Sequence, residues 1–436
     1  MQLTMNSEKS KNESKSSTLK WEVHRIGEVC KTGAGGTPLK SYKEYYEGGQ
    51  IPWLLSGEVA QGEIFESKNF ITQIGLENSS ARIFPIDTVL VAMYGATAGQ
   101  VGILRFEAAT NQAVCGILPN KNFIPKFIYY AILSKKEELI SKAAGNAQPN
   151  ISQIKIKDTE IPVPPLSEQK RIVSIVDEAF EGIDRAIANT EKNLTNAHEL
   201  FESYLNAVFT QKGDGWIEKK LGDICSIKHG FAFKGEFFTN DESKYILLTP
   251  GSFHESGGYR EQGERTKYYV GEMPDGYILN SGDFLFAMTE QAVGLLGSSL
   301  IVPESDRFLH NQRLGLVQIV AGVAWHNDFF FHQFNTKNFR SAVQSSASGV
   351  KVRHTSPNKL GAISVFFPPT IAEQKAVADT LNELLAETQH LTVIYKQKLA
   401  ALKELKQSIL QKAFTGEFTA DNANQTIKTT EEEICV

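Results

Sequence analysis

The chain has 436 residues, 41% of them apolar and 10% aromatic, which is enough material for more than one hydrophobic core. Its net charge is −5, whereas proteins that bind nucleic acid unaided usually carry an excess of Lys and Arg, so composition argues mildly against a free-standing DNA-binding protein. No apolar run of about eighteen residues occurs and the N-terminus has no apolar leader, so we expect no membrane span and no export, and place the protein in the cytoplasm.

The chain begins with a polar tail and continues into strand-like segments. Residues 1–19 are rich in Lys and Ser and predict a disordered tail, whose three lysines are more often solvated than bound to nucleic acid or a membrane. From Trp21 onward, short runs of branched and aromatic residues separated by Gly and Pro predict β-strands. The expected strands are 23–30, 51–55, 83–94, 101–106 and 113–118, with a helix over 123–143. These segments predict an α+β domain over residues 20–163.

A long helix is expected next, over residues 164–211. Its apolar residues, with Thr190 among them, recur mostly in alternating steps of three and four, as the seam of a coiled coil requires. The predicted seam positions are 172, 176, 179, 183, 187, 190, 194, 197, 201, 204 and 208. The pair Pro164-Pro165 blocks a helix upstream, and Ser167 is expected to cap the first turn. At about 1.5 Å per residue the helix would be roughly 60 Å long.

The rest of the chain repeats this plan. The Trp, Gly and Cys residues of segment 21–30 return in segment 216–225, and the Glu-Gln-Lys motif at 168–170 returns at 373–375. The chain is therefore a tandem duplication in which a domain and a helix alternate. The predicted segments are a disordered tail 1–19, a first domain 20–163, a central helix 164–211, a second domain 212–367, a C-terminal helix 368–416 and a flexible acidic tail 417–436.

The second helix has its own start signals and its own seam. It follows the pair Pro368-Pro369, and Thr370 with Glu373 forms a capping box. Its apolar spacing is regular as far as Tyr395 and looser beyond it. Two seams in one chain predict that the helices pair with each other as a coiled coil.

The two domains match in their expected cores and differ in their loops. Matched positions are mostly apolar strand residues and turn glycines, whereas loops such as 96–100 and 291–294 carry unlike side chains. Two domains that recognise different targets would show this pattern, and ordinary drift after duplication would produce it equally well.

Charge is distributed unevenly along the chain. Lys and Arg balance Asp and Glu in both globular segments, at 14 against 14 over residues 21–160 and 15 against 15 over residues 216–369, while the first helix is acidic, at 4 against 8. If DNA is the partner, other subunits must therefore help to hold its phosphates.

Catalytic and metal-binding signatures are missing from the sequence. There is no Gly-Lys dipeptide and hence no phosphate-binding P-loop, and the glycines at 33–36 depart from the dinucleotide-binding pattern. The proline pairs precede helices and do not form the Asn/Asp-Pro-Pro-aromatic loop of adenine methyltransferases. The nine histidines show no metal-ligand spacing. Cys30, Cys115, Cys225 and Cys435 are far apart and are expected to be reduced and mostly buried. We expect no catalysis by this chain alone, no cofactor and no metal.

Several motifs in this order resemble the specificity subunit of type I restriction–modification systems. They are Trp with Gly-Glu/Asp-x-Cys, Gly35-Gly36-Thr37-Pro38, Ile51-Pro52-Trp53, 89–95, Asn111-Gln112 and the two Pro-Pro…Glu-Gln-Lys helix starts. The resemblance covers roughly residues 20–418, and the duplicated domain–helix plan is its strongest part. The second domain departs from it, because Gly230-Phe231-Ala232-Phe233-Lys234 stands where the first has its Gly-Gly-Thr-Pro loop.

The resemblance implies two tandem target recognition domains of α/β type, each reading one half of a split double-stranded DNA sequence, and two long helices that pair antiparallel as a spacer. It also implies two methyltransferase subunits and restriction/translocase subunits as partners, which together defend the cell against phage. S-adenosylmethionine, ATP and Mg²⁺ are expected on those partners only.

Residues that contact DNA are expected in loops rich in amide, hydroxyl and basic side chains, because these groups read base edges and hold phosphates. In the first domain the candidates are Lys31, Thr37, Tyr94, Thr97, Gln100, Gln148 and Asn150. In the second domain they are Lys228, Lys234, Thr289, Gln291, Lys351, Arg353 and His354. Each of them taken alone is more often a solvated loop side chain.

Two other functions remain open at this point. A structural scaffold whose paired domains bind proteins would suit the neutral charge of both domains. A fused methyltransferase is the least favoured, and specific binding of S-adenosylmethionine by the isolated chain would support it.

Overall fold

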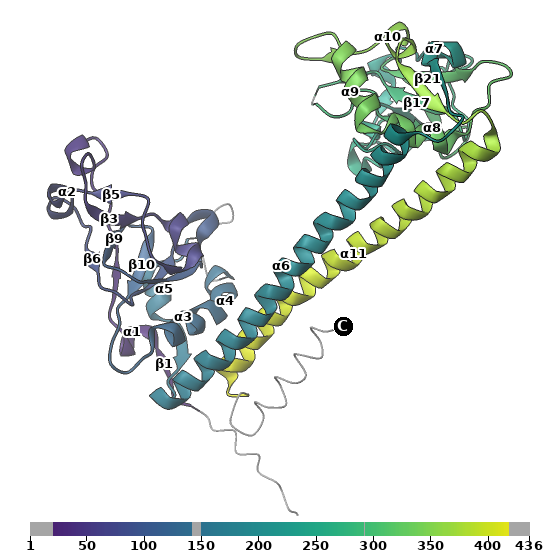
Figure 1. Cartoon of the computed structure of the whole chain (residues 1–436). Coiled ribbons are helices and arrows are strands. Elements are labelled where there is room, and N and C mark those ends of the chain that lie inside the picture. Colours follow the sequence, from purple (N-terminus) through teal and green to yellow (C-terminus); the bar gives the residue numbers. More distant parts are fainter. Residues whose placement is uncertain (1–20, 142–149, 292, 418–436) are drawn as a thin grey trace, which may run out of the picture. The chain divides into compact units, whose positions relative to one another are not determined.

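The computed structural model describes residues 21–141, 150–291 and 293–417 (Figure 1). The expected tail 1–19 and nearly all of the expected tail 417–436 lie outside the described residues. Within the described residues, no helix is both long and apolar enough to cross a membrane.

The chain divides into two compact units, and each contains one α+β domain with one half of each long helix. The second unit is the continuous stretch Glu191–Lys396, and the first combines the chain up to Thr190 with the chain from Gln397 onward. The long helices are α6 (Leu166–Gln211) and α11 (Ile371–Thr415), so both expected long helices are confirmed.

The first domain has a five-stranded sheet of order β2-β10-β7-β8-β4, a four-stranded sheet of order β5-β3-β9-β6 and a short β1-β11 ribbon. Its strands are β1 (Val23–Arg25), β2 (Thr32–Ala34), β3 (Ile51–Leu54), β4 (Gly62–Ile64), β5 (Phe70–Ile71), β6 (Ile83–Phe84), β7 (Val89–Ala92), β8 (Val101–Leu104), β9 (Ala108–Thr110), β10 (Val114–Ile117) and β11 (Glu160–Pro162). Its helices are α1 (Ile26–Val29), α2 (Gln73–Glu77), α3 (Pro125–Ser134), α4 (Lys136–Ser141) and α5 (Gln153–Lys157), with 3-10 turns η1 (Lys43–Tyr45), η2 (Ser56–Gln61) and η3 (Gly95–Thr97).

The second domain has two four-stranded sheets, of orders β13-β21-β17-β19 and β14-β16-β15-β20, and ribbons β12-β23 and β18-β22. Its strands are β12 (Ile217–Lys220), β13 (Cys225–His229), β14 (Phe238–Thr239), β15 (Tyr245–Leu248), β16 (Tyr268–Tyr269), β17 (Phe284–Ala287), β18 (Thr289–Glu290), β19 (Ser299–Ile301), β20 (Phe308–His310), β21 (Leu314–Ile319), β22 (Arg353–His354) and β23 (Ser364–Phe367). Its helices are α7 (Leu221–Ile224), α8 (Asn327–Phe334), α9 (Lys337–Ser346) and α10 (Pro357–Gly361), with 3-10 turns η4 (Gly235–Phe237), η5 (Pro250–Ser252) and η6 (Gly263–Arg265).

The repeat seen in the sequence extends to individual backbone contacts. Gly35 N donates to Val114 O at 3.0 Å, and its counterpart Gly230 N donates to Leu314 O at 3.3 Å. Both glycines are required by close approach, since a Cβ at Gly35 would lie 2.1 Å from Thr110 Oγ1 and one at Gly230 would lie 2.0 Å from a backbone carbonyl oxygen. The two domains are thus built on one scaffold.

Three expected elements differ from the structure. The strand expected over 23–30 ends at Arg25, because Arg25 N donates to the Glu28 carboxylate at 3.1 Å and starts the helical turn α1. The strand expected over 83–94 is split into β6 and β7 by a turn that contains Asp87 at φ +68°. The helix expected over 123–143 is two helices that meet at Lys135, and residues 142–143 lie outside the described residues.

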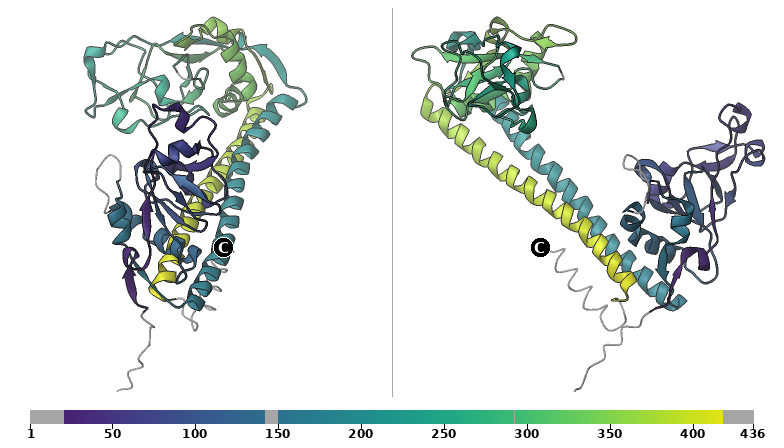
Figure 2. Two further views of the ribbon diagram at one scale, coloured as in Figure 1. Left: turned by 90° about the vertical axis from the view of Figure 1, so that its left-hand side faces the viewer. Right: turned by 180° about the vertical axis from the view of Figure 1, so that it is seen from behind.

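The two long helices run antiparallel. In the first unit the N-terminal half of α6 lies beside the C-terminal half of α11 in all views (Figure 1, Figure 2), where Ile183 and Ile409 belong to one core and Lys406 Nζ lies 2.6 Å from the Asp184 carboxylate. In the second unit the other halves share a core around Leu205 and Leu381.

Two details of the first helix differ from the prediction. The expected seam residue Tyr204 is 42% exposed and Leu205 is buried in its place, because the end of α6 turns its apolar face to the second domain. Ser167 lies inside the first turn, since α6 already begins at Leu166. The capping residue of α11 is confirmed, with Glu373 N donating to Thr370 Oγ1 at 3.2 Å.

A buried glutamine joins each domain to the helix that follows it. Gln169 is fully buried; its Oε1 accepts from Ile124 N at 2.9 Å and its Nε2 donates to Asn122 O and Pro164 O, each at 3.0 Å. All three partners are backbone groups, so this glutamine fixes the segment before α3 on the first turn of α6. The Glu-Gln-Lys motif is therefore a joint between domain and helix.

The second domain repeats the joint. Gln374 is fully buried; its Oε1 accepts from His326 N at 2.8 Å and its Nε2 donates to Ala324 O and Pro368 O, each at 3.0 Å. The same three bonds thus hold the segment before α8 on the first turn of α11.

Candidate functional site

The first domain gathers polar loops at one end of its five-stranded sheet. Because β2 and β7 both run antiparallel to β10, the segments that follow β2 and β7 lie beside the turn that precedes β10. Residues 35–37, 94–100 and 111–113 therefore meet there. Asn150 joins them through a bridge with Tyr94, and Ile151 N donates to Met93 O at 2.8 Å. We call these four segments the first loop end.

The second domain assembles the same end from its own residues. Strands β13 and β17 run antiparallel to β21, which brings together residues 228–231, 289–291 and 311–313. The bridge equivalent to that of Tyr94 and Asn150 is the pair Thr289 and His354 in the β18-β22 ribbon. Thr355 N donates to Met288 O at 3.0 Å, as Ile151 does to Met93. These segments with Arg353–His354 form the second loop end.

The structure brings most of the predicted residues of the first domain together. Thr37, Tyr94, Thr97, Gln100 and Asn150 all lie at the first loop end, and Tyr94 is 39% exposed. Lys31 is exposed but lies at the opposite end of β2, where its carbonyl oxygen accepts from Leu118 N at 2.9 Å. Gln148 lies outside the described residues.

In the second domain, Lys228, Thr289, Gln291, Arg353 and His354 lie at the second loop end. Lys351 is exposed in the turn that leads into β22, and Lys234 is exposed at the start of η4, where its Nζ is 3.9 Å from Glu236. These last two residues lie on segments that border the second loop end.

Two basic side chains of the second loop end are held by the protein itself. Lys228 Nζ donates to Gly276 O at 2.8 Å and lies 4.3 Å from the centre of the Tyr277 ring. The Arg353 guanidinium donates to Glu290 at 3.3 Å and to the backbone oxygen of Gln344 at 2.6 Å. The exposed polar residues that remain at this end are His229, Gln291, Gln312, Arg313 and His354.

Several exposed residues at the loop ends were not among the sequence candidates, and Gln112, Gln312, Arg313 and His229 are the polar ones. Gln112 and Gln312 occupy the same place in the two domains, in the turn before β10 or β21, and Arg313 follows Gln312. Gln112 Oε1 accepts from Thr37 Oγ1, so these two polar groups of the first loop end act as one surface. The repeated Asn-Gln dipeptide was the signal that could have identified Gln112 and Gln312.

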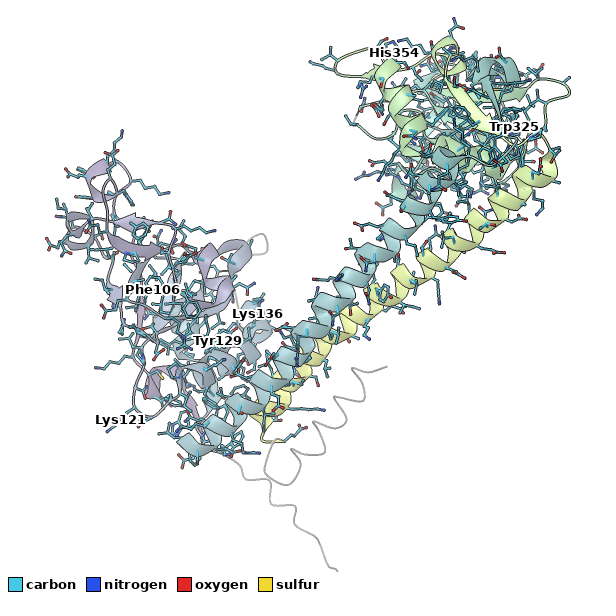
Figure 3. The ribbon with its side chains drawn as sticks, in the orientation of Figure 1. Phe106, Lys121, Tyr129, Lys136, Trp325 and His354 are labelled. Carbon is cyan, nitrogen blue, oxygen red and sulfur yellow. The ribbon has the colours of Figure 1, made fainter. Side chains whose placement is uncertain are left out.

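The loop ends lie away from the joints with the long helices. Figure 3 shows His354 well apart from Trp325, whose neighbours Ala324 and His326 bond to Gln374. The second loop end is therefore separate from the joint at Gln374.

Several buried titratable groups of the two domains have strongly shifted pKa values. Burial lowers the pKa of His310 to about 4, so this fully buried ring is neutral and bonds to Leu314 O at 3.0 Å. Burial raises the pKa of the Cys115 and Cys225 thiols to about 12, and both are free, buried cysteines, as is Cys30. Within the described residues no group of three His, Cys, Asp or Glu could hold a metal ion. The loop ends offer hydrogen-bonding groups, which suits recognition.

Comparison with known proteins gives consistent matches. The family model described as the type I restriction modification DNA specificity domain matches twice, at residues 18–196 and 213–403. The EcoR124I/EcoR124II specificity subunit of Escherichia coli is 27% identical over 44% of this chain and 50% of its own length. The MjaVIII specificity subunit of Methanocaldococcus jannaschii is 22% identical over 93% of this chain and 94% of its own length. This chain thus spans about half the length of the EcoR124I/EcoR124II specificity subunit, and the same holds for the MjaIX subunit of Methanocaldococcus jannaschii and the EcoBI subunit of Escherichia coli.

Solved structures share the fold. A chain from a study of complex assembly and conformational transition of the type I R-M system superposes with a TM-score of 0.73 at 18% identity, covering 91% of this chain and 98% of that one. The HsdS subunit of Thermoanaerobacter tengcongensis gives 0.58 at 17% identity, covering 91% and 97%. With both copies of the family model matched on this fold, the chain belongs to the type I restriction–modification DNA specificity family.

Proposed function

We propose that this chain is the DNA-reading subunit of a type I restriction–modification complex and that each loop end reads one half of a bipartite, non-palindromic site. The observation that carries the proposal is the loop end built twice on one scaffold from different side chains, with Tyr94 and Asn150 in one domain and Thr289 and His354 in the other. Different side chains at equivalent positions select different bases, so the two half-sites differ.

In this proposal, partner subunits supply what the chain lacks. Each domain carries equal numbers of basic and acidic residues, so the methyltransferase subunits provide most phosphate contacts and close around the DNA. They also bind S-adenosylmethionine and methylate adenine, and restriction/translocase subunits use ATP and Mg²⁺. The cytoplasmic location remains a prediction from the sequence.

Mapping methylated adenines in the DNA of cells that carry the complete system tests the proposal. We expect one gapped sequence with two unlike halves, because the two loop ends carry unlike residues. A continuous or perfectly palindromic site would contradict it. A gel-shift assay with the methyltransferase subunits present tests the scaffold alternative, which would stand if the assembly had no sequence preference.

Exchange of a domain tests the independence of the halves. Residues 21–160 replaced by the same region of a relative should change one half-site and leave the other unchanged, because each loop end is built within one domain. Methylation mapping reports both halves in one experiment. A change in both halves would show that the domains do not read independently.

A further inference from the structure

The hairpin at the second loop end is longer than its counterpart in the first domain. The first closes with Gly99 N donating to Ala92 O at 2.9 Å, and the second with Gly297 N donating to Ala287 O at 2.8 Å. The closing residues are seven apart in the first domain and ten apart in the second. The second hairpin therefore has three more residues to hold in place.

The first hairpin holds itself through its backbone. Ala98 N donates to Gly95 O at 3.1 Å and Gln100 N donates to Thr97 O at 3.0 Å, which makes the single 3-10 turn η3. One short side chain adds a bond, since Thr97 Oγ1 donates to Tyr94 O at 3.3 Å, and within the described residues no buried carboxylate takes part.

The second hairpin is held by a buried carboxylate at the position that Gly95 occupies in the first domain. Glu290 has a side chain only 1% exposed, and it accepts from Gly294 N at 3.0 Å and from Leu296 N at 2.8 Å. Arg340 Nη2 donates to Gly294 O on the other side. Glu290 and Arg340 thus hold the segment of the hairpin from Gly294 to Leu296 in place.

The same carboxylate ties the hairpin to the β22 strand and to α9. Arg353 Nη1 lies 3.3 Å from Glu290, and Gln344 Nε2 donates to Glu290 at 3.2 Å. Arg353 also donates to Gln344 through both terminal nitrogens. The hairpin, β22 and α9 are therefore joined through one acidic group.

The energetics make this network cooperative. A carboxylate taken out of water is costly unless each lone pair finds a donor, and Glu290 has four donors from three segments. Removal of one partner leaves a buried charge short of a bond, and the remaining segments lose their common anchor.

We propose that Glu290 positions the second loop end for DNA and that Arg353 acts through Glu290 and Gln344 and makes no contact with a base. This inference rests on the proposed function. Both residues are positioning residues of the second half-site, and the bases are read by the exposed side chains that they hold in place.

The test uses the complete assembly with its methyltransferase subunits and a panel of duplexes in which each base pair of both half-sites is changed singly. The variants are Glu290→Gln, Glu290→Ala, Arg353→Ala and the double variant Glu290→Gln/Arg353→Ala. Glu304→Gln is the matched control, an exposed glutamate of the same domain that lies 3.7 Å from Arg307.

Glu290→Gln and Arg353→Ala should each weaken methylation about ten- to a hundredfold, the range for one or two charge-assisted hydrogen bonds, at all second-half positions alike. Glu290→Gln should retain more activity than Glu290→Ala, because its amide oxygen still accepts from Gly294 and Leu296. The double variant should be little worse than the poorer single variant, as expected for one network. The first half-site and the Glu304→Gln variant should be unaffected.

Three results would overturn the inference. One is Arg353→Ala relaxing selection at a single base pair while Glu290→Gln has no effect, since Arg353 would then read that base. Another is full additivity of the two substitutions, and the third is equal loss at both half-sites. Failure of the proposed function itself would appear separately, as a wild-type assembly without any second half-site. If Glu290→Ala does not fold, Glu290→Gln and Arg353→Ala still decide the question.

Discussion

At the scale of single residues, the repeat conserves bonds more strictly than side chains. Gln169 and Gln374 make the same three backbone bonds, but the contacts beside them have changed partners. In the first unit Tyr130 Oη donates to the Asp177 carboxylate at 2.5 Å, while at the equivalent place the His332 ring bonds to Asn382 at 2.7 Å. The central glutamine of the joint is therefore the same in both units, whereas different side chains make the hydrogen bond beside it.

Replacing Gln374, the central glutamine of the second joint, should therefore destabilise the second unit. We expect Gln374→Ala to lower the free energy of unfolding of the second unit by about 2–4 kcal/mol, because three buried backbone groups lose their partner. Gln374→Glu should cost more at pH 7, since a carboxylate cannot donate to the Ala324 and Pro368 carbonyls. Hydrogen exchange of the first turns of α8 and α11 measures the effect.

The exposed Gln389 of the same helix provides the control, and Gln389→Ala should leave exchange unchanged. Equal exchange rates in Gln374→Ala and the wild type would show that the joint contributes no stability.

At the scale of elements, the end of α6 has a local test. Heptad spacing predicted Tyr204 in the seam, whereas Leu205 is 5% exposed and packs with the second domain. We expect Leu205→Ala to cost about 2–5 kcal/mol, as for other buried leucines, and Tyr204→Ala to change stability by less than about 0.5 kcal/mol. Denaturant unfolding of the two variants compares the positions directly, and a larger loss for Tyr204→Ala would favour the heptad prediction.

Local sequence signals predicted the long helices and failed where tertiary packing decides. Proline pairs, a capping box and apolar spacing mark the long helices, and all of these signals are local. The break at Lys135 lies in a stretch without Gly or Pro, so nothing local indicates that α3 and α4 part there. The positive φ of Asp87 likewise depends on the turn around it.

The sequence identified the loops of the candidate site, but it did not show which of their residues lie together in the fold. Loop composition identified Tyr94 and Asn150, but only strand register shows that they meet and that Lys31 lies at the other end of β2. Likewise, Arg353 has the composition of a base-reading residue, and the buried Glu290 that holds it is far from it in sequence. Sequence gives the chemistry of a loop, whereas the partners of each side chain come from the fold.

At the scale of the whole molecule, the proposed function makes the two long helices the spacer between two half-sites. Both pass from one unit to the other, α6 at Thr190–Glu191 and α11 at Lys396–Gln397. Four residues inserted at both points should lengthen both helices by about 6 Å, somewhat under two base pairs at about 3.4 Å each. We expect the methylated gap to grow by about one or two base pairs with both half-sites unchanged.

Methylation mapping of the insertion variant measures the gap, and insertion in α6 alone is the control. A four-residue insertion is a stutter that a coiled coil absorbs by local unwinding, so the paired variant should fold. An active paired variant with the original gap would show that the helices do not set the spacing.

The division of the chain into a continuous unit and a split one has a consequence for biosynthesis. The second unit is inserted within the first, so Ile172 and Ile183 of α6 leave the ribosome long before Leu402 and Ile409, with which they form one core. At about 5–20 residues per second the delay is on the order of 10–50 s. During that time the newly made first unit exposes an apolar helix face, and a nascent chain that stops before residue 397 never covers it. The unit that is synthesised first is completed last.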